Sequence, residues 1–190
     1  LTERITRDGE QIDQQEFADC VAAIADIEVL AGVRPSYFDI MTAAAFRYFA
    51  DSAVDVAVIE VGMLGRWDAT NVVKSDVAVI TNIALDHMEF AGPTLQHIAH
   101  EKVGISKANS SLVIGDENPE LFPVWNESLH AKLIRRGEDF ELNENQLAVG
   151  GRSLSVRTSR ASYSDIHLPL HGIHQGSNAS IALAAVEEFF

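Results

Sequence analysis

The 190-residue chain carries 28 Asp and Glu against 14 Lys and Arg, a formal net charge of −14 that argues against a nucleic-acid partner, because binding a polyanion requires basic side chains. Its 47% hydrophobic content is typical of a globular domain with an apolar core, and no apolar run approaches the roughly 18 residues of a membrane-spanning helix. The first residues, LTERITRDGEQ, lack the basic and apolar regions of a targeting signal, so we expect a cytoplasmic protein.

The first fifty residues predict two helices. Apolar residues recur at helical spacing over 13–31 and 37–50, and Gly32 and Pro35 interrupt the pattern between them. Cys20, the single cysteine, lies in the apolar pattern of the first segment. We therefore expect a buried structural thiol in a reducing compartment.

The central part of the chain predicts a parallel α/β sheet. Short runs rich in Val and Ile, with almost no polar interior, are typical of strands buried on both faces, and they lie at 55–62, 75–83 and 110–116. Helical patterns follow the second and third runs, at 94–107, where Thr94 is a plausible N-cap, and at 118–134. This alternation favours a mostly parallel sheet flanked by helices.

The last third of the chain changes pattern. Residues 139–170 alternate apolar and polar positions, with turn signals at NEN and GG, which favours antiparallel strands or an edge hairpin. A Gly-containing turn then precedes a strongly apolar helix that we expect to start near Ser177 or Asn178. No linker is long enough to separate two domains, so residues 1–190 are expected to form one domain.

Charged residues follow two of the predicted strands. Glu60 ends the first run, and Asp86 and His87 come after the second. Ligands of parallel sheets bind beyond the carboxyl ends of the strands, so these groups are expected on one edge. One carboxylate and one imidazole are too few for zinc but suit Mg²⁺, which keeps several waters and takes phosphate oxygens, and Mg²⁺ in turn implies a nucleotide.

Each of these residues also has a structural interpretation. Glu60 could be a solvated strand-end residue or a partner of Arg66, and His87 a hydrogen-bonded structural histidine. Asp68 could cap a turn through its carboxylate. Lys102 lies near the end of a predicted helix, where the helix dipole and the neighbouring Glu101 favour an ammonium group.

Four ordered motifs carry a resemblance to a known family: EVGMLGRWDATNVV, TNIALDHMEFAG, AHEKVGISK and HGIHQGSNASIAL. Together with RPSYFDIMTAAAFRYFA at 34–50, they resemble the folylpolyglutamate synthase and dihydrofolate synthase family, ATP-dependent ligases related to the Mur ligases of cell-wall synthesis. The resemblance extends over nearly the whole chain. It implies a Mur ligase-type central ATP-binding domain with a small antiparallel segment.

The resemblance implies a reaction and a set of residues. In the family, ATP activates a carboxylate as an acyl phosphate, and the amino group of L-glutamate then forms the amide with dihydropteroate, a reduced folate, or both. Glu60 and His87 match the magnesium ligands, and Lys102 matches a carbamylated lysine. Asn178 matches the residue that contacts adenine, although an N-cap role for the last helix is also compatible.

The pterin-bearing substrate is held in the family by two loops that match 36–39 and 67–69. Tyr37, Phe38 and Trp67 offer flat apolar surfaces for a pteridine ring, with core packing as the competing interpretation. The candidate substrate residues are Tyr37, Phe38, Asp39, Trp67, Asp68 and Ala69.

This chain departs from the family pattern at two positions and lacks other parts of the site. It has Leu64 where the family usually has a second glycine, and Ala91 where a leucine is usual. No phosphate-binding loop of the form GxxxxGK[ST] occurs, so the resemblance places that loop upstream of Leu1 and a C-terminal ligase domain after Phe190. The alternatives are a Mur-type ligase for a cell-wall precursor and a noncatalytic interaction module that retains the fold.

Overall fold

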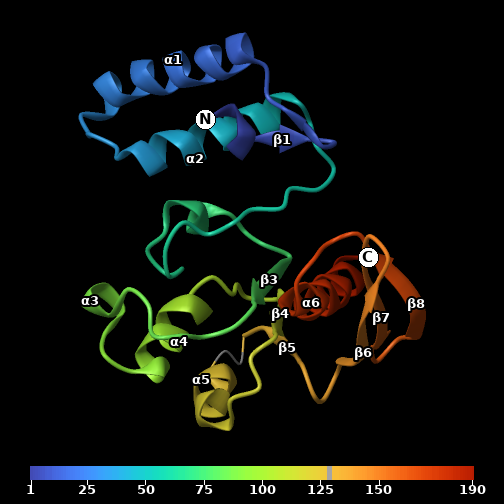
Figure 1. Ribbon diagram of the computed structural model, residues 1–190. Helices are drawn as coiled ribbons and strands as arrows, with labels where there is room; N and C mark the ends of the chain where they lie inside the picture. Colours follow the sequence, from blue (N-terminus) through green and yellow to red (C-terminus); the bar gives the residue numbers. More distant parts are fainter. Residues whose placement is uncertain (128–129) are drawn as a thin grey trace. The chain divides into compact units, whose positions relative to one another are not determined.

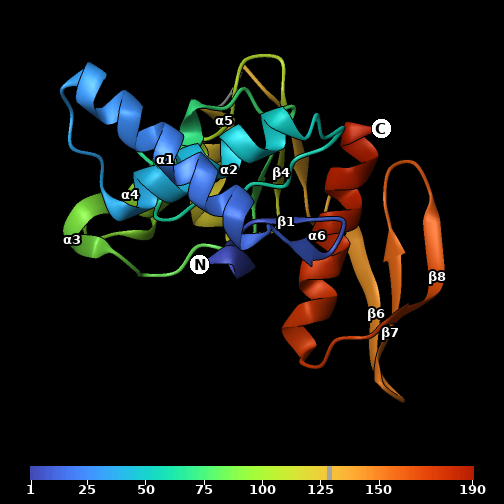
Figure 2. The ribbon, with the colours of Figure 1, turned by 90° about the horizontal axis from the view of Figure 1, so that it is seen from above.

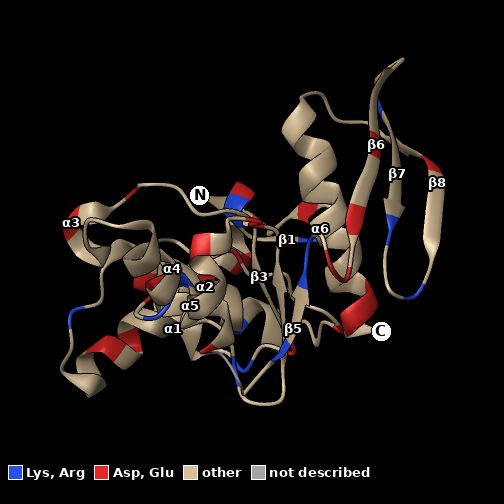
Figure 3. Cartoon of the chain, turned by 90° about the horizontal axis from the view of Figure 1, so that it is seen from below, with Lys and Arg blue, Asp and Glu red and all other residues tan. Residues whose placement is uncertain are grey.

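The computed structural model describes residues 1–127 and 130–190, which divide into two compact units (Figure 1). The first comprises Leu1–Gly62 and Asp68–Val72, and the second comprises Met63–Trp67 and Val73–Phe190. The segment 60–73, one of the four family motifs, therefore contributes residues to both units. Carboxylates outnumber basic side chains in each unit (Figure 3).

The first unit is mainly two helices, and both were predicted. Its elements are η1 (Thr2–Arg4), β1 (Thr6–Arg7), β2 (Glu10–Gln11), α1 (Gln14–Ala31), α2 (Tyr37–Asp51) and η2 (Ala69–Val72). The Asp13 side chain accepts from the first backbone N–H groups of α1, and Gly32 ends the helix in the left-handed conformation, with φ of 65°. Cys20 is buried in the core of this unit, as expected, and burial raises the pKa of its thiol.

A three-stranded parallel sheet, in the order β3-β4-β5, forms one layer of the second unit. The elements of this part are β3 (Val77–Ile80), α3 (Met88–Ala91), α4 (Leu95–Val103), β4 (Ser111–Ile114), η3 (Pro119–Leu121), α5 (Phe122–Asn126) and β5 (Lys132–Arg135). Thr94 caps α4 through its hydroxyl, as predicted. The core under α4 and α5 contains Ile80, Leu112 and Trp125.

The helix predicted over 118–134 is wrong. Only η3 and α5 are helical there, residues 128 and 129 lie outside the described part of the chain, and Lys132–Arg135 is a strand. Because Ile134 is buried beside β4, pairing with a neighbouring strand decides the conformation of this short run.

The strand predicted over 55–62 is also absent from the described structure. These residues are assigned to no sheet, and Val58 is 93% exposed. β-branched side chains favour an extended backbone, but a strand also needs a hydrogen-bonded partner. Glu60 therefore does not end a strand of the described sheet.

The antiparallel strands predicted over 139–170 are confirmed as β6 (Glu141–Ala148), β7 (Gly151–Arg157) and β8 (Ser162–Leu168), in that order. Gly150, with φ of 76°, lies in the tight turn between the first two. The turn predicted at NEN is wrong, because these residues belong to β6, where a register shift between Leu142 and Glu144 absorbs the irregular pattern.

The last helix, α6 (Ile173–Phe189), begins at Ile173, four residues before Ser177. It contacts β3 and β4 of the parallel sheet and β6 and β7 of the antiparallel sheet, and Figure 2 shows it running alongside β6 and β7. Ile181 and Ala184 pack with Val113, Ile134 and Phe140. None of the helices that the structure describes is long and apolar enough to cross a membrane.

Candidate functional site

The segments that follow β3, β4 and β5 lie side by side at the carboxyl edge of the parallel sheet. The backbone N–H of Gly115 donates to Ile80 at 2.8 Å, and that of Arg136 donates to Ile114 at 3.0 Å. The Asp116 carboxylate accepts from the Ile83 backbone N–H at 2.8 Å and so joins the loop after β3 to the loop after β4. These three loops therefore form the carboxyl edge of the sheet, where a ligand is expected.

Gly115 allows the close approach of these segments. A Cβ atom at this position would lie 2.6 Å from the carbonyl oxygen of Thr81 and would overlap the side chain of Ile181 in α6. A glycine thus brings the loop after β3 and the body of α6 together at the carboxyl edge.

His87 occupies a strained backbone position after β3. It precedes α3 in the left-handed region, with φ of 51°, and its backbone N–H donates to the Asp86 carboxylate at 2.9 Å. The His87 Nε2 atom lies 3.5 Å from the other oxygen of Asp86. A non-glycine residue in this region costs on the order of 1–3 kcal/mol, and such strain clusters at functional sites. The imidazole and the carboxylate of these two neighbouring residues therefore lie next to each other in the loop after β3.

The described residues contain no group of three or more His, Cys, Asp or Glu side chains that could hold a metal. Glu60, the other predicted magnesium ligand, belongs to the first unit and is exposed there. Carboxylate oxygens suit Mg²⁺, which completes its coordination with water and phosphate oxygens, whereas an imidazole nitrogen suits it less well.

Lys102 lies in the last turn of α4, and the EVGMLGRWDATNVV motif reaches this turn through Arg66. The Arg66 backbone N–H donates to the Glu101 carbonyl at 3.0 Å, and its guanidinium donates to the His100 carbonyl at 2.9 Å. Arg66 Nε also lies 3.3 Å from the Glu101 carboxylate. Arg66 therefore satisfies carbonyl groups at the C-terminus of α4, where a positive charge is favoured.

Two glycines make this docking possible. A Cβ atom at Gly104 would lie 2.6 Å from the Cβ atom of Arg66, and one at Gly65 would lie 3.1 Å from the carbonyl oxygen of Lys102. The structure thus brings two of the four family motifs into contact around the half-buried Lys102. The helix-dipole interpretation of Lys102 stays compatible with this position.

Asn178 is exposed on α6 and is not its N-cap, so that alternative is wrong. Gly172 occupies the N-cap position without a side-chain hydrogen bond, and Asn178 follows one turn inside the helix. Its side-chain Nδ2 group lies 3.4 Å from the Gln175 Oε1 atom. The exposed amide is thereby held by a neighbour on the same helix.

The three candidates in SYFD have different environments. Tyr37 is 55% exposed, whereas the ring of Phe38 packs so closely on Gly62 that a Cβ atom there would overlap it. Asp39 forms a capping box with Ser36 at the start of α2, and hydrogen bonding to the Ser36 side chain and backbone lowers the pKa of the Asp39 carboxyl. Phe38 is therefore half-buried against Gly62 and Asp39 caps α2, while Tyr37 presents its ring to solvent.

The candidates in WDA also differ. Trp67 is 86% exposed, so it does not pack in the core of its unit. Asp68 accepts hydrogen bonds from the Thr70 backbone at 2.9 Å and from the Thr70 hydroxyl at 2.6 Å, just before η2, which begins at Ala69. The predicted turn-capping role of Asp68 is confirmed.

Leu64, where the family usually has glycine, adopts a left-handed backbone with φ of 58°. Only glycine enters this region without a steric penalty, so this position keeps a backbone that favours glycine while its side chain strains it.

Asp116 and Arg136 were missed by the sequence analysis. Asp116 is the last residue of the run 110–116, so the strand-end rule that selected Glu60 and Asp86 could have found it. Arg136 follows β5, which was not predicted, and therefore carried no such signal.

Comparison with known proteins identifies the family of the chain. A family model described as the Mur ligase middle domain matches residues 28–186. A dihydrofolate synthase/folylpolyglutamate synthase of Mycobacterium tuberculosis is 42% identical over 99% of the chain and 43% of the relative. The chain thus spans less than half the length of that relative.

Solved structures give the same match. Mycobacterium tuberculosis folylpolyglutamate synthase complexed with ADP superimposes with a TM-score of 0.89 at 42% identity, over 100% of this chain and 45% of that chain. An FPGS-AMPPCP-folate complex superimposes with a TM-score of 0.93 at 31% identity, over 100% of this chain and 48% of that chain. The mixed α/β fold with a parallel sheet and added antiparallel strands is therefore that of these structures.

Proposed function

Because the chain belongs to the Mur ligase middle domain family, we propose that the protein containing it is an ATP-dependent ligase. The proposed reaction joins L-glutamate to dihydropteroate, to a reduced folate, or to both. The observation that carries this proposal is 42% identity, over nearly the whole chain, to a dihydrofolate synthase/folylpolyglutamate synthase. The structures of such proteins with ADP, and with AMPPCP and folate, support ATP and a folate-type substrate as ligands.

The proposed chemistry has two steps. A carboxylate oxygen of the pterin-bearing substrate attacks the γ-phosphorus of ATP, which releases ADP and forms an acyl phosphate. The amino group of L-glutamate then attacks the acyl carbon, phosphate leaves, and the ammonium proton is lost to solvent as the amide forms. Both steps depend on positioning and charge neutralisation rather than on covalent help from the protein.

Glu60 and His87 are proposed to hold magnesium. Mg²⁺, when bound, neutralises the ATP phosphates and the charge that develops on them. The imidazole of His87, which lies beside the Asp86 carboxylate in the loop after β3, supports this role. Glu60 is proposed on the motif alone.

Lys102 is proposed to carry a carbamate. Its neutral amine attacks CO₂, a C–N bond forms and one proton is lost, so that a cation becomes an anion able to orient the metal. The contacts that Arg66 makes around the last turn of α4 support the role, because they fix the backbone from which Lys102 projects.

The remaining candidates are proposed to bind the organic groups. Asn178 would contact adenine, since an exposed amide can both donate to and accept from a base edge. The exposed rings of Tyr37 and Trp67 would contact the pterin. Phe38, Asp39, Asp68 and Ala69 would shape the same two loops, since three of them are engaged in packing or capping.

Residues 1–190 are proposed to form the central ATP-binding domain of a longer cytoplasmic protein. The relatives are about twice as long as this chain, which supports a phosphate-binding loop and a C-terminal ligase domain supplied by the rest of the protein.

The experiment is glutamate-dependent phosphate release by the full-length protein, with dihydropteroate and tetrahydrofolate compared. We expect release with at least one of them, and Lys102→Ala should lower the rate about a hundredfold or more, as for removal of a group that orients a metal. Lys102→Glu should recover part of the loss, because a carboxylate replaces the carbamate.

Lys74→Ala is the matched control, because it removes an exposed lysine from the same unit and should leave the rate unchanged. Absence of glutamate-dependent release with both substrates would contradict the ligase proposal and favour the interaction module. Full activity of Lys102→Ala would remove the proposed role of that lysine alone.

A further inference from the structure

Arg136, directly after β5, contacts the first turns of α6 on either side of Asn178 in the sequence. Its two terminal nitrogens donate to the Ser177 hydroxyl at 2.6 Å, the Ser177 carbonyl at 2.8 Å and the Ser180 hydroxyl at 2.9 Å. Its guanidinium also lies 5.6 Å from the centroid of the Phe140 ring. A planar group with three directed hydrogen bonds and a stacked face fixes position more strictly than a single contact.

A second arginine holds the same end of the helix from the antiparallel sheet. Arg152 is buried in β7 and donates to the side chain of Asn145 and, at 2.7 Å, to its carbonyl. The Asn145 amide then donates to the Ile173 carbonyl in the first turn of α6 at 2.8 Å. A Cβ atom at Gly176 would lie 2.5 Å from this amide, so the helix and β6 are in direct contact.

Electrostatics alone does not explain these two arginines. Within residues 1–127 and 130–190, neither Arg136 nor Arg152 forms an ion pair, and all their acceptors are neutral. The N-terminal end of a helix is already the positive end of its dipole, so a nearby cation is unfavourable there. The contacts are therefore best explained by the geometry that they impose on residues 173–180.

We propose that Arg136 is a positioning residue for Asn178, assisted by the Arg152–Asn145 pair. By fixing Ser177 and Ser180 to the carboxyl end of β5, Arg136 sets where the Asn178 amide stands at the edge of the sheet. Gln175 fixes the orientation of that amide. This inference rests on the proposed function, in which Asn178 contacts the adenine ring of ATP.

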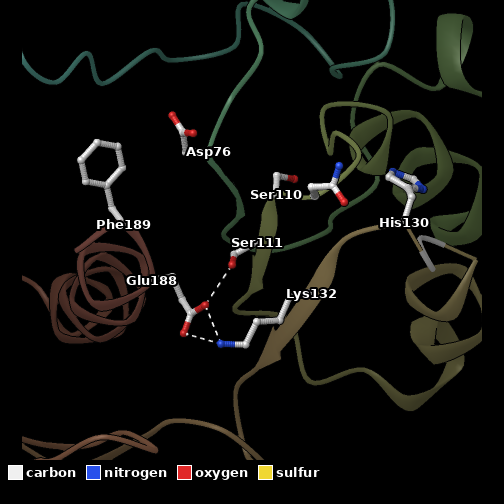
Figure 4. A pocket seen from close by; sticks show the side chains of 8 residues that line it. Asp76, Ser110, Ser111, His130, Lys132, Glu188 and Phe189 are labelled. Carbon is white, nitrogen blue, oxygen red and sulfur yellow. Dashed lines mark hydrogen bonds and ion pairs between the residues drawn. The ribbon is translucent and has the colours of Figure 1, made fainter.

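The opposite end of α6 offers a matched control. Figure 4 shows the Glu188 carboxylate near the amino ends of β4 and β5, where it accepts from the Ser111 hydroxyl at 2.9 Å and from Lys132 at 2.8 Å. Lys132→Met therefore removes a cation that ties the same helix to the same sheet, but at the edge away from Asn178.

The test is a double-mutant cycle on ATP binding by the full-length protein. We expect Asn178→Ala and Arg136→Met each to raise the Kd for ATP about tenfold, while the Kd for the pterin substrate stays within about twofold. In the Asn178→Ala background, Arg136→Met should add less than about twofold, since the residue through which it acts is gone. Lys132→Met should lower the Tm and leave the Kd for ATP within about twofold.

Three results separate the possible failures. If Asn178→Ala leaves the Kd for ATP unchanged, the adenine contact in the proposed function is wrong. If Arg136→Met raises the Kd equally in both backgrounds, or raises the Kd for both substrates, Arg136 is only structural and the inference is overturned. Where Arg136→Met does not fold, Ser177→Ala removes one acceptor and should raise only the Kd for ATP, about threefold. If Ser177→Ala leaves the Kd for ATP unchanged, the inference is overturned.

Discussion

The same five residues, DVAVI, occur at 55–59 and at 76–80 and have different structures. The second copy contains β3, where Ala78 is 4% exposed and Ile80 is 3% exposed beside β4. The first copy joins no sheet of the described structure, and its Val58 is 93% exposed. The same five residues thus form a strand only where a neighbouring strand and an apolar layer are present.

The largest effect expected from this comparison is on stability. Ile80→Ala should lower the free energy of unfolding by about 3 kcal/mol, because it leaves a cavity in the core between the sheet and α4. Ile59→Ala, the same substitution at the matching position, should cost less than about 1 kcal/mol, since Ile59 is only half-buried and its neighbours Val58 and Glu60 are exposed. Urea denaturation of both variants measures the difference. Equal losses in the full-length protein would show that 55–59 is also buried as a strand there.

This comparison also explains how much of the fold could be predicted from the sequence. The helices at 13–31 and 37–50 were predicted because their signals are local: apolar residues at helical spacing and the interruption at Gly32 and Pro35. The caps at Asp13 and Ser36, which the structure adds, are local as well. Strand formation depends on pairing with another strand, and the local sequence pattern does not show which segments pair. As a result 55–62 was predicted and does not form a strand, whereas Lys132–Arg135 forms one and was not predicted.

The candidate site divides in the same way. Asp86 and His87 could be found from the sequence because they follow an apolar run directly. Arg136 could not, because its acceptors Ser177 and Ser180 are 41 and 44 residues away in the chain. The docking of Arg66 onto Glu101 is equally nonlocal, and only the two glycines at its contact surface hint at it.

A second prediction concerns Glu188, which is hydrogen-bonded to Ser111 of β4, the strand that pairs with β3. The side chain of Glu188 is only 7% exposed. Burial raises its pKa, but hydrogen bonds from Lys132 and Ser111, with the charges of Lys132 and Arg160, outweigh burial and hold the pKa below its ordinary value. Glu188→Gln should therefore lower the free energy of unfolding by about 1–2 kcal/mol at pH 7.

The loss of stability in Glu188→Gln should depend on pH in a direction that follows from the lowered pKa. A lowered pKa in the folded state means that the unfolded chain binds the proton more readily, so the stabilisation is full above the ordinary carboxyl pKa. It disappears as the pH falls through the lower folded value. The difference in the free energy of unfolding between the unsubstituted protein and Glu188→Gln should therefore shrink on acidification. A difference that stays constant with pH would assign the effect to packing. Ile59→Ala serves as a control whose effect should not vary with the pH.

The smallest expected effect concerns one loop residue downstream of each copy of the pentapeptide. Leu64 comes after the first copy and His87 after the second, and both are non-glycine residues with positive φ, 58° and 51°. Glycine removes the steric cost of this backbone but adds chain entropy to the unfolded state, so Leu64→Gly and His87→Gly should each change stability by no more than about 1 kcal/mol. Thermal unfolding measures that change, and phosphate release separates the two positions. Leu64→Gly should retain activity because it introduces the glycine that the family resemblance implies, whereas His87→Gly should lose it because it removes the imidazole that is proposed to hold magnesium. A loss of activity in both would mean that the backbone strain itself, rather than the imidazole, serves the reaction.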